Sequence, residues 1–325
     1  MANKNYILSV SSLFTGALVW GLIWYPYRAL EDAGIGGAIA SFLTYGPGFI
    51  AGIFLLRGRP AVFRHRPVLL LVVAASAGWC NLAYVLAALR GEVMTVMLLF
   101  YLAPLWTVMF ARWILGERPG VYGYAVVGLA LCGALIMLWR PNADFPWPTT
   151  VAEWLGLSAG MAFALSNVLS RKLGDVDEMT RSVAVCAGVV LVALPVIVFF
   201  EDPIQAVASL DARSGWLLAV VAVVIFSVNP VVQFGLGRVG ANQAIVIFLA
   251  EIVVAAIAST LLAAEVISAR QWLGGALVVA AALCAGKLAG SNTIPSARSA
   301  DNMPAVAPSP VPASSLSSDV PRPPT

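Results

Sequence analysis

Ten separate runs of roughly 20 apolar residues constrain this chain more than any other feature. A run of that length crosses a bilayer as one helix. Only helices and closed barrels satisfy their backbone groups in lipid, and barrel strands alternate polar and apolar residues. These runs do not alternate, so the sequence predicts an all-α integral membrane protein. The predicted spans are 6–27, 35–56, 67–89, 93–114, 121–139, 151–171, 181–200, 215–236, 242–263 and 270–289.

Charge is scarce in this chain, because 11% of its residues are charged, whereas soluble domains carry about a quarter. The net charge of +3 includes no basic block, so we expect no nucleic-acid partner. The four cysteines lie inside apolar runs without metal-ligand spacing, and the one histidine, His65, lies in a loop. The sequence therefore predicts no metal site, no cofactor and no histidine-based catalysis.

Lys and Arg are unevenly divided between the two ends of the predicted spans. One set of loops holds twelve of them and the other set five, and the second set also collects acids such as Glu31, Glu201 and Asp211. Because positive loops stay in the cytoplasm, this bias places both chain termini there. The Ser-, Pro- and Ala-rich residues 291–325 cannot bury a core, so we expect a disordered cytoplasmic tail.

The chain matches itself when it is shifted by 148 residues. Asn81 then falls on Asn229, and Glu117 falls on Glu265. Each copy holds five spans, and an odd number makes the copies enter the membrane from opposite sides. The sequence therefore predicts two inverted five-helix repeats, 1–140 and 141–290, followed by the tail 291–325. In proteins built this way the substrate site lies near the midplane between the halves.

The stretch YLAPLWTVMFARWILGERPGVYGYAVVG (101–128) resembles the EamA-type module of the drug/metabolite transporter superfamily. The shared pattern is a Pro, a Glu thirteen residues later, then an aromatic residue and a Gly in the next helix: Pro104, Glu117, Tyr124 and Gly128. The second copy keeps Glu265, Trp272 and Gly275, and its Glu251 matches the Glu of a Leu-Glu-Pro motif in which Ile252 replaces the Pro. The resemblance covers about residues 7–289 and implies a cavity lined by spans 1, 3, 4, 6, 8 and 9.

Glu251 is the only charged residue in the stretch IVIFLAEIVVAAIAST (245–260). A carboxylate at the centre of a bilayer costs about 2.5–3.5 kcal/mol on insertion scales. No Lys or Arg of any span lies at this depth, so three states are open: the acid is protonated, it hydrogen-bonds Asn, Ser or Tyr, or it faces a wet cavity. Its role is then either proton coupling or recognition of a substrate amine, or else only a bond between neighbouring helices.

Other side chains at mid-depth complete the predicted cavity. The first half of the chain contributes aromatic rings, and the second half contributes amides and the acid, which suits a small solute with an apolar part and a polar or cationic end. Each of these residues also fits a purely structural role in helix packing or anchoring. The predicted substrate-binding residues are Trp20, Trp24, Asn81, Tyr84, Tyr101, Phe163, Asn167, Asn229 and Glu251, with Glu251 as the coupling candidate.

Repeat, motifs and polar residues together predict a secondary transporter of the bacterial inner membrane. We expect it to export an amino acid or a related amphipathic metabolite by alternating access. Import of a vitamin or another metabolite is the alternative within the superfamily, and a non-transporting sensor or structural protein is the alternative of another class. No GxxxxGK[ST] motif is present, so coupling to protons, exchange and downhill movement stay open.

No enzymatic activity is expected, because the acids, histidines and metal ligands that a membrane enzyme needs do not cluster near one interface. The expected partners are a small-molecule substrate and the lipid bilayer, with protons as the candidate coupling ion. The protein is expected to act as a monomer or a homodimer.

Overall fold

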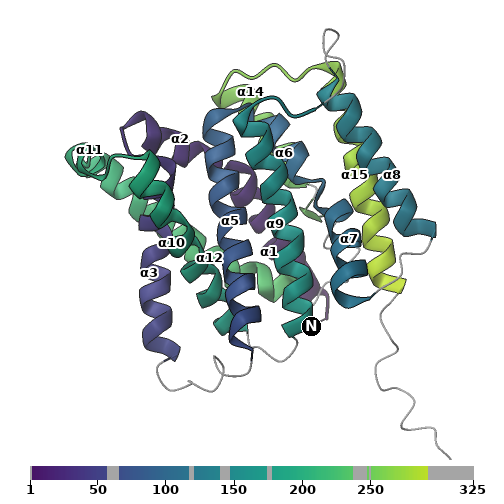
Figure 1. Cartoon of the computed structure of the whole chain (residues 1–325), viewed down its shortest axis with the longest axis horizontal. Helices are drawn as coiled ribbons and strands as arrows, with labels where there is room; N and C mark the ends of the chain where they lie inside the picture. Colours follow the sequence, from purple (N-terminus) through teal and green to yellow (C-terminus); the bar gives the residue numbers. More distant parts are fainter. Residues whose placement is uncertain are drawn as a thin grey trace, which may run out of the picture. The chain divides into compact units, whose positions relative to one another are not determined.

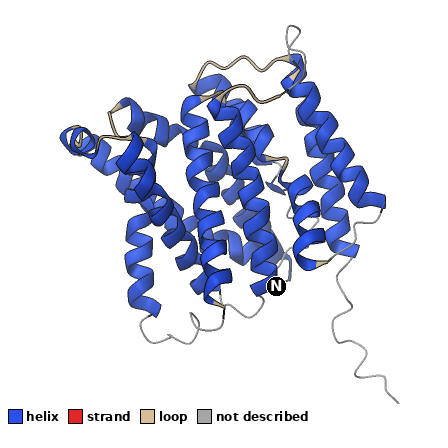
Figure 2. Cartoon of the chain, in the orientation of Figure 1, coloured by secondary structure: helices blue, strands red, loops and turns tan. Residues whose placement is uncertain are grey.

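The computed structural model describes residues 2–56, 66–116, 121–139, 147–173, 178–236, 247–248 and 250–291. These ranges are helical with short connections and contain no strand (Figure 2). The elements (Figure 1) are α1 (Ala2–Leu22), α2 (Trp24–Asp32), α3 (Gly37–Leu56), α5 (Pro67–Arg90), α6 (Val93–Phe100), α7 (Ala103–Leu115), α8 (Val121–Leu138), α9 (Val151–Leu173), α10 (Glu178–Phe200), α11 (Pro203–Ala208), α12 (Ala212–Leu236), α14 (Ala250–Leu262) and α15 (Ala269–Ser291).

The helices lie where the apolar runs predicted them. Five described segments are long and apolar enough to cross a membrane: Tyr6–Asp32, Gly37–Phe54, Pro67–Arg90, Val93–Leu115 and Met179–Phe200. Three shorter apolar helices, Gly123–Leu138, Ala212–Val228 and Ala250–Leu262, fall in other predicted spans. The chain is therefore an all-helical, multi-pass membrane protein.

Two of the predicted spans differ from the single helices that we expected. The first continues to Asp32 and contains a turn at Ile23 between α1 and α2. The span predicted at 93–114 is interrupted at Tyr101 and Leu102, between α6 and α7. In an unbroken helix the carbonyl group of Phe100 would accept a hydrogen bond from residue 104, but Pro104 has no N–H to donate. Pro104 instead lies in the first turn of α7, where a missing N–H is tolerated.

The two halves of the chain are interleaved. If the first half is exchanged for the second, α1–α2 correspond to α9, α3 to α10, α5 to α12, α6–α7 to α14, and α8 to α15. Several helix contacts occur in pairs that this exchange relates. The contact of α5 with α9 matches that of α12 with α1, and the contact of α5 with α10 matches that of α12 with α3. The contacts of α6 and α7 with α9 match that of α14 with α1. Three further pairs, α3–α10, α6–α14 and α8–α15, each join a helix to its own counterpart. This helix packing is that of two related repeats.

Small residues allow the helices of these pairs to approach closely. A Cβ atom added to Gly133 of α8 would lie 2.7 Å from the carbonyl oxygen of Gly274 of α15. A Cβ atom on Gly274 would in turn lie 2.6 Å from the carbonyl oxygen of Gly133. Both contacts involve backbone that cannot move aside, so close approach here requires glycine on each helix. In Figure 1 the two helices lie side by side.

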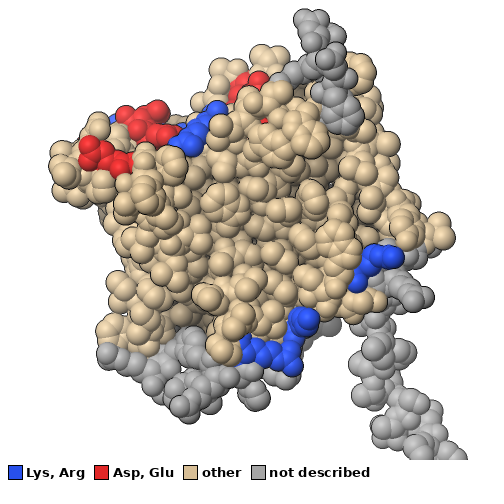
Figure 3. All heavy atoms as spheres, viewed as in Figure 1, with Lys and Arg blue, Asp and Glu red and all other residues tan. Residues whose placement is uncertain are grey.

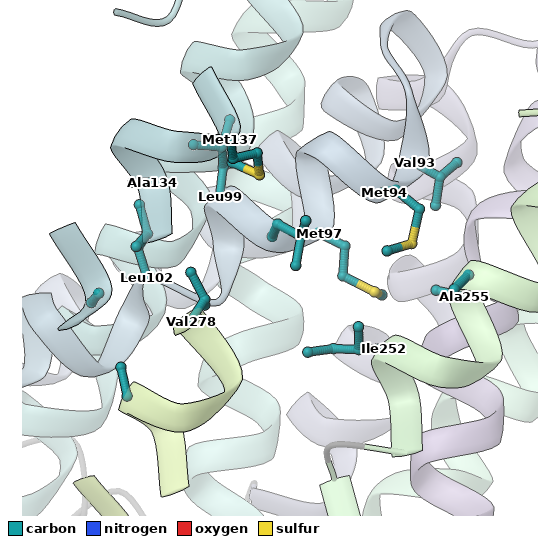
Figure 4. Close-up of a cluster of buried hydrophobic side chains, with 14 of the residues drawn as sticks. Val93, Met94, Met97, Leu99, Leu102, Ala134, Met137, Ile252, Ala255 and Val278 are labelled. Atoms are coloured by element: carbon teal, nitrogen blue, oxygen red, sulfur yellow. The ribbon is translucent and has the colours of Figure 1, made fainter. Parts of the chain in front are cut away.

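A buried apolar cluster joins the two halves around α6. Met97 of α6 and Ile252 of α14 belong to it, together with Val278 of α15 and Met137 of α8. Figure 4 shows the side chain of Met97 between α6 and α14, near Ile252. The cluster fixes α6 against the second repeat, so the break that follows α6 is held between the halves.

The charged residues lie at the ends of the helices. On the face shown in Figure 3, the acidic atoms of the described residues gather at the end where α2 and α11 lie. Lys and Arg atoms are visible at both ends of that face, and the middle is apolar. An uncharged band between charged ends is typical of a protein that spans a bilayer.

Candidate functional site

The break between α6 and α7 brings Tyr101 to Glu251. The Tyr101 hydroxyl donates a hydrogen bond to the Glu251 carboxylate with an O–O distance of 2.9 Å, and it lies 3.3 Å from the carbonyl oxygen of Phe248. Glu251 lies in α14. The two residues come from opposite repeats.

Glycines bring the first helix of each repeat against a helix of the other repeat at the site. A Cβ atom on Gly21 of α1 would lie 2.9 Å from the carbonyl oxygen of Glu251. A Cβ atom on Gly160 of α9 would overlap the carbonyl oxygen of Phe100, the last residue of α6. Both contacts are to backbone, so larger side chains at either position would push the helices apart at the site.

Aromatic rings from both repeats surround the break. The Phe100 ring lies at the centre, with centroid distances of 5.5 Å to Tyr84, 5.9 Å to Tyr101 and 5.4 Å to Phe163. Tyr84 belongs to α5 and Phe163 to α9, so the rings come from three spans. Their faces carry negative charge density and attract a cation.

Two buried polar atoms have no hydrogen-bond partner among the residues that the structure describes: the Tyr84 hydroxyl oxygen and Trp106 Nε1. A buried donor without a partner costs roughly 1–3 kcal/mol, so such atoms are uncommon in native proteins. Tyr84 is also close enough to Glu251 to interact with it electrostatically. The Tyr84 hydroxyl is therefore a buried polar group beside Glu251 without a hydrogen-bond partner among the described residues.

Three of the predicted site residues have structural contacts of their own. Trp24 is buried, donates its Nε1–H to the carbonyl oxygen of Gly21 at 3.0 Å, and its ring faces the Arg28 guanidinium. Asn81 accepts a hydrogen bond from the Tyr45 hydroxyl at 2.7 Å, which joins α5 to α3, and it also donates to its own helix. Trp20 is half-buried against apolar residues of two clusters.

The remaining predicted residues divide into those at the site and those outside it. Tyr84, Tyr101, Phe163 and Glu251 are brought together as described above. Asn167 is exposed on α9, one turn beyond Phe163. Asn229 lies in α12, and its side chain is outside the described part of the chain. The structure thus assembles the ring-and-carboxylate part of the predicted set.

Arg28 and Glu265 connect the two repeats at the end of the site. Arg28 donates to the carbonyl oxygens of Ala88 and Gly91 at 2.9 and 2.7 Å and forms an ion pair with Glu265 at 3.4 Å. Glu265 also accepts the backbone N–H of Val93 at 2.9 Å, which caps the start of α6. Glu265 therefore caps a helix of the other repeat.

A second glutamate makes the same kind of contact nearby. Glu201, which follows α10, accepts the backbone N–H groups of Ala38 and Ile39 at 2.8 and 2.9 Å. These groups belong to the first turn of α3, in the other repeat. Acids from the second repeat thus cap two helices of the first repeat and tie the halves together at this end.

Phe100, Arg28 and Glu265 were not among the predicted site residues. A signal existed for Phe100, because its carbonyl group loses its donor to Pro104. The role of Arg28 depends on a contact with a residue 237 positions away, which no local pattern reveals. Within the described ranges, no cluster of His, Cys, Asp or Glu that could hold a metal ion occurs.

Comparison with known proteins shows which family shares this architecture. A family model described as the EamA-like transporter family matches residues 7–139 and again residues 150–286. A comparison with curated proteins found no match. Of the solved structures, 14 chains match. One, titled only "Crystal structure of protein", has a TM-score of 0.55 and 20% identity over 86% of this chain and 97% of its own, and so shows a shared fold.

The two matched segments are the two interleaved repeats, and together they cover most of the chain. The resemblance that Pro104 and Glu265 suggested is therefore confirmed. The family is one of membrane transporters. This chain belongs to the EamA-like transporter family of the drug/metabolite transporter superfamily.

Proposed function

We propose that this protein is a ten-span secondary transporter of the bacterial inner membrane that exports a small solute with an apolar part and a cationic end. Amino acids and related amphipathic amines have this chemistry. Both termini would lie in the cytoplasm, and the two inverted repeats, 1–140 and 141–290, would rock around the site between α6, α7 and α14.

The observation that carries this proposal is the Glu251 carboxylate beside a group of aromatic rings. Its side chain accepts a hydrogen bond from the neutral Tyr101 hydroxyl, and the nearby Arg28 pairs with Glu265 instead. A carboxylate without a cation in a membrane span is unfavourable and is typically found where a cation or proton binds. A substrate amine would supply the missing charge, and the Phe100 group of rings would cover its apolar part.

The capped end supports movement by alternating access. Arg28, Glu265 and Glu201 join the repeats at one end of the helices, on the side that the Lys and Arg bias assigns to the exterior. Contacts of this kind must break whenever the site opens toward that side. The arrangement is therefore that of a carrier whose outer end is closed.

Proton coupling is the energy source that the site supports best. The titratable groups that interact with Glu251 are Tyr84 of α5 and Tyr101. The helices packed against α14 are α1 and α6, and their described side chains carry no charge. A proton and a substrate amine would then compete for the Glu251 carboxylate. Because only one of them is bound at a time, alternating access would exchange one for the other across the membrane.

Flux in proteoliposomes tests the proposal. The purified full chain is reconstituted, and radiolabelled amino acids and aromatic amines are supplied with and without a proton gradient. We expect gradient-driven accumulation of at least one of these solutes without chemical conversion. The Glu251→Gln variant should lose this accumulation, because a neutral amide neither pairs with an amine nor releases a proton.

Glu31→Gln is the matched control, because Glu31 is an exposed acid at the end of α2. This control should transport at the wild-type rate. Full, pH-insensitive transport by Glu251→Gln would refute coupling at Glu251. Chemical conversion of a solute without any flux would refute the transporter assignment itself, and accumulation only in the opposite orientation would identify an importer.

A further inference from the structure

Gly21, Trp24 and Arg28 lie on one face of α1 and α2, each about one helical turn nearer the outer end of the molecule. The outer end is the one that the Lys and Arg bias assigns to the exterior. Ile23 has α-helical backbone angles, so the face continues across the turn between the two helices. Gly21 lies against the carbonyl oxygen of Glu251, and Arg28 lies against a carbonyl oxygen in the last turn of α5. Trp24 is therefore placed between the candidate site and the outer end.

The Trp24 side chain fills the space between helices of both repeats at this level. Its exposed fraction is 1%, and its apolar cluster also contains Ala88 of α5, Val93 of α6 and Ala255 of α14. Ala255 lies one turn farther out than Glu251 on the same helix. A solute that moves outward from Glu251 between these helices therefore meets the indole ring first.

Arg28 holds the indole in place and joins the surrounding helix ends. Its guanidinium lies 4.9 Å from the centre of the Trp24 ring, a distance at which a cation and an indole attract each other. The same group donates to the carbonyl oxygens of Ala88 and Gly91 and pairs with Glu265. Gly91 and Glu265 line a polar pocket of about 920 Å³. Arg28 therefore separates the Trp24 ring from this pocket.

Helix α2 carries both Trp24 and Arg28 and is joined to α1 by a turn at Ile23. Pro26 explains this turn, because it has no N–H to donate to the carbonyl group one turn before it. Helix α9, the counterpart of α1 and α2 in the second repeat, is continuous and has Leu169 at the position that corresponds to Pro26. Hinges of moving segments are typically a few residues at the ends of such elements. The first repeat can thus bend at Ile23, whereas the matching part of α9 has no break.

We propose that Trp24 and Arg28 form the outer gate of the carrier. When α2 bends at Ile23, Arg28 leaves Glu265 and the indole leaves its cluster, so that the site opens into the polar pocket. The freed Glu265 carboxylate then meets the cationic end of the departing solute. This inference rests on the proposed function, because it names the route by which an exported solute leaves the site.

Thiol labelling in right-side-out membrane vesicles tests the gate without any solute. The four native cysteines are replaced by alanine, and Ala255→Cys is introduced as a reporter at a fully buried position of the cluster that contains Trp24. A membrane-impermeant maleimide is added outside, and the rate of labelling is followed by mass spectrometry. We expect slow labelling while the gate is intact.

Two variants should open the gate. Trp24→Ala removes the ring, and Arg28→Gln removes the charge that holds the ring and pairs with Glu265. Each should raise the labelling rate of the reporter at least about tenfold, the effect of one charge-assisted hydrogen bond on an equilibrium. Trp216→Ala and Arg213→Gln are the matched controls, because both residues are exposed on α12. The controls should label at the rate of the reporter alone.

Unchanged labelling in either gate variant would overturn the proposal. An equal rise at Ala193→Cys, a fully buried position of α10 in another cluster, would also overturn it, because it would show that the variants loosen the whole fold. Flux through wild-type proteoliposomes is measured separately. Absence of flux would count against the proposed function, whereas flux together with unchanged labelling would count against the gate alone.

Discussion

The hydrogen bond between Tyr101 and Glu251 can be measured with a double-mutant cycle. The variants are Tyr101→Phe, Glu251→Gln and both together, and the measured quantity is the free energy of unfolding. The bond joins two repeats at 2.9 Å. Interhelical hydrogen bonds in membranes contribute about 0.6 kcal/mol on average, and a charged acceptor roughly doubles that. The expected coupling is therefore about 1.2 kcal/mol at neutral pH.

A neutral pair of equal length provides the comparison. The hydroxyl groups of Tyr27 and Thr44 share a hydrogen bond of 2.9 Å between buried side chains. The cycle of Tyr27→Phe and Thr44→Val should give about 0.6 kcal/mol. Both bonds have the same length and involve a buried tyrosine hydroxyl, but only the first has an ionisable acceptor, so the pH dependence of their difference reports the charge on Glu251.

Reversible unfolding in mixed micelles, followed by helical circular dichroism, supplies the free energies. The coupling of the Tyr101–Glu251 pair should fall to the control value when the pH is lowered far enough to protonate the carboxylate. A coupling no larger than that of the control at every pH would refute the argument. It would mean that Glu251 is neutral throughout and only connects helices.

Three further predictions follow from contacts described above. Gly160→Ala should separate α9 from the broken helix and lower the unfolding temperature, whereas Gly128→Ala, at a position with open space around it, should not. Glu265→Gln should speed hydrogen exchange at the amide of Val93, which it caps, by at least about tenfold, without changing the first turn of α3. Hydrogen bonds from the backbone and side chain of Ser214 lower the pKa of Asp211. The start of α12 should therefore be stabilised at neutral pH and lose that stabilisation as the pH falls below about 4. The protection of the first-turn amides of α12 against hydrogen exchange should depend less on pH in Ser214→Ala than in the wild type.

Apolar runs made the helices predictable because hydrocarbon imposes both their length and their composition. The break at Tyr101 and Leu102 was not predicted, although Pro104 was noticed, because a proline in a membrane helix can also produce a simple kink. Whether a bend becomes a break depends on neighbours such as Gly160, which lies against the carbonyl group that the proline leaves without a donor. That contact is set by tertiary structure and has no local pattern.

The candidate site was predicted in part for a related reason. Depth in the membrane can be inferred from a sequence, and Tyr84, Tyr101, Phe163 and Glu251, which were chosen on that basis, lie around the break at Phe100. Helix rotation cannot be inferred in this way. Trp24 and Asn81 were chosen on the same basis, but the first stacks beneath Arg28 and the second bonds Tyr45.

The interleaved repeats have a consequence for how the chain is made. Synthesis delivers α1 and α3 to the membrane long before α12 and α14, their partners from the second repeat, leave the ribosome. Arg28 in particular enters 237 residues ahead of Glu265. The newly made first half must therefore reside in lipid with the surfaces that will contact the second repeat still exposed, until the second half is inserted.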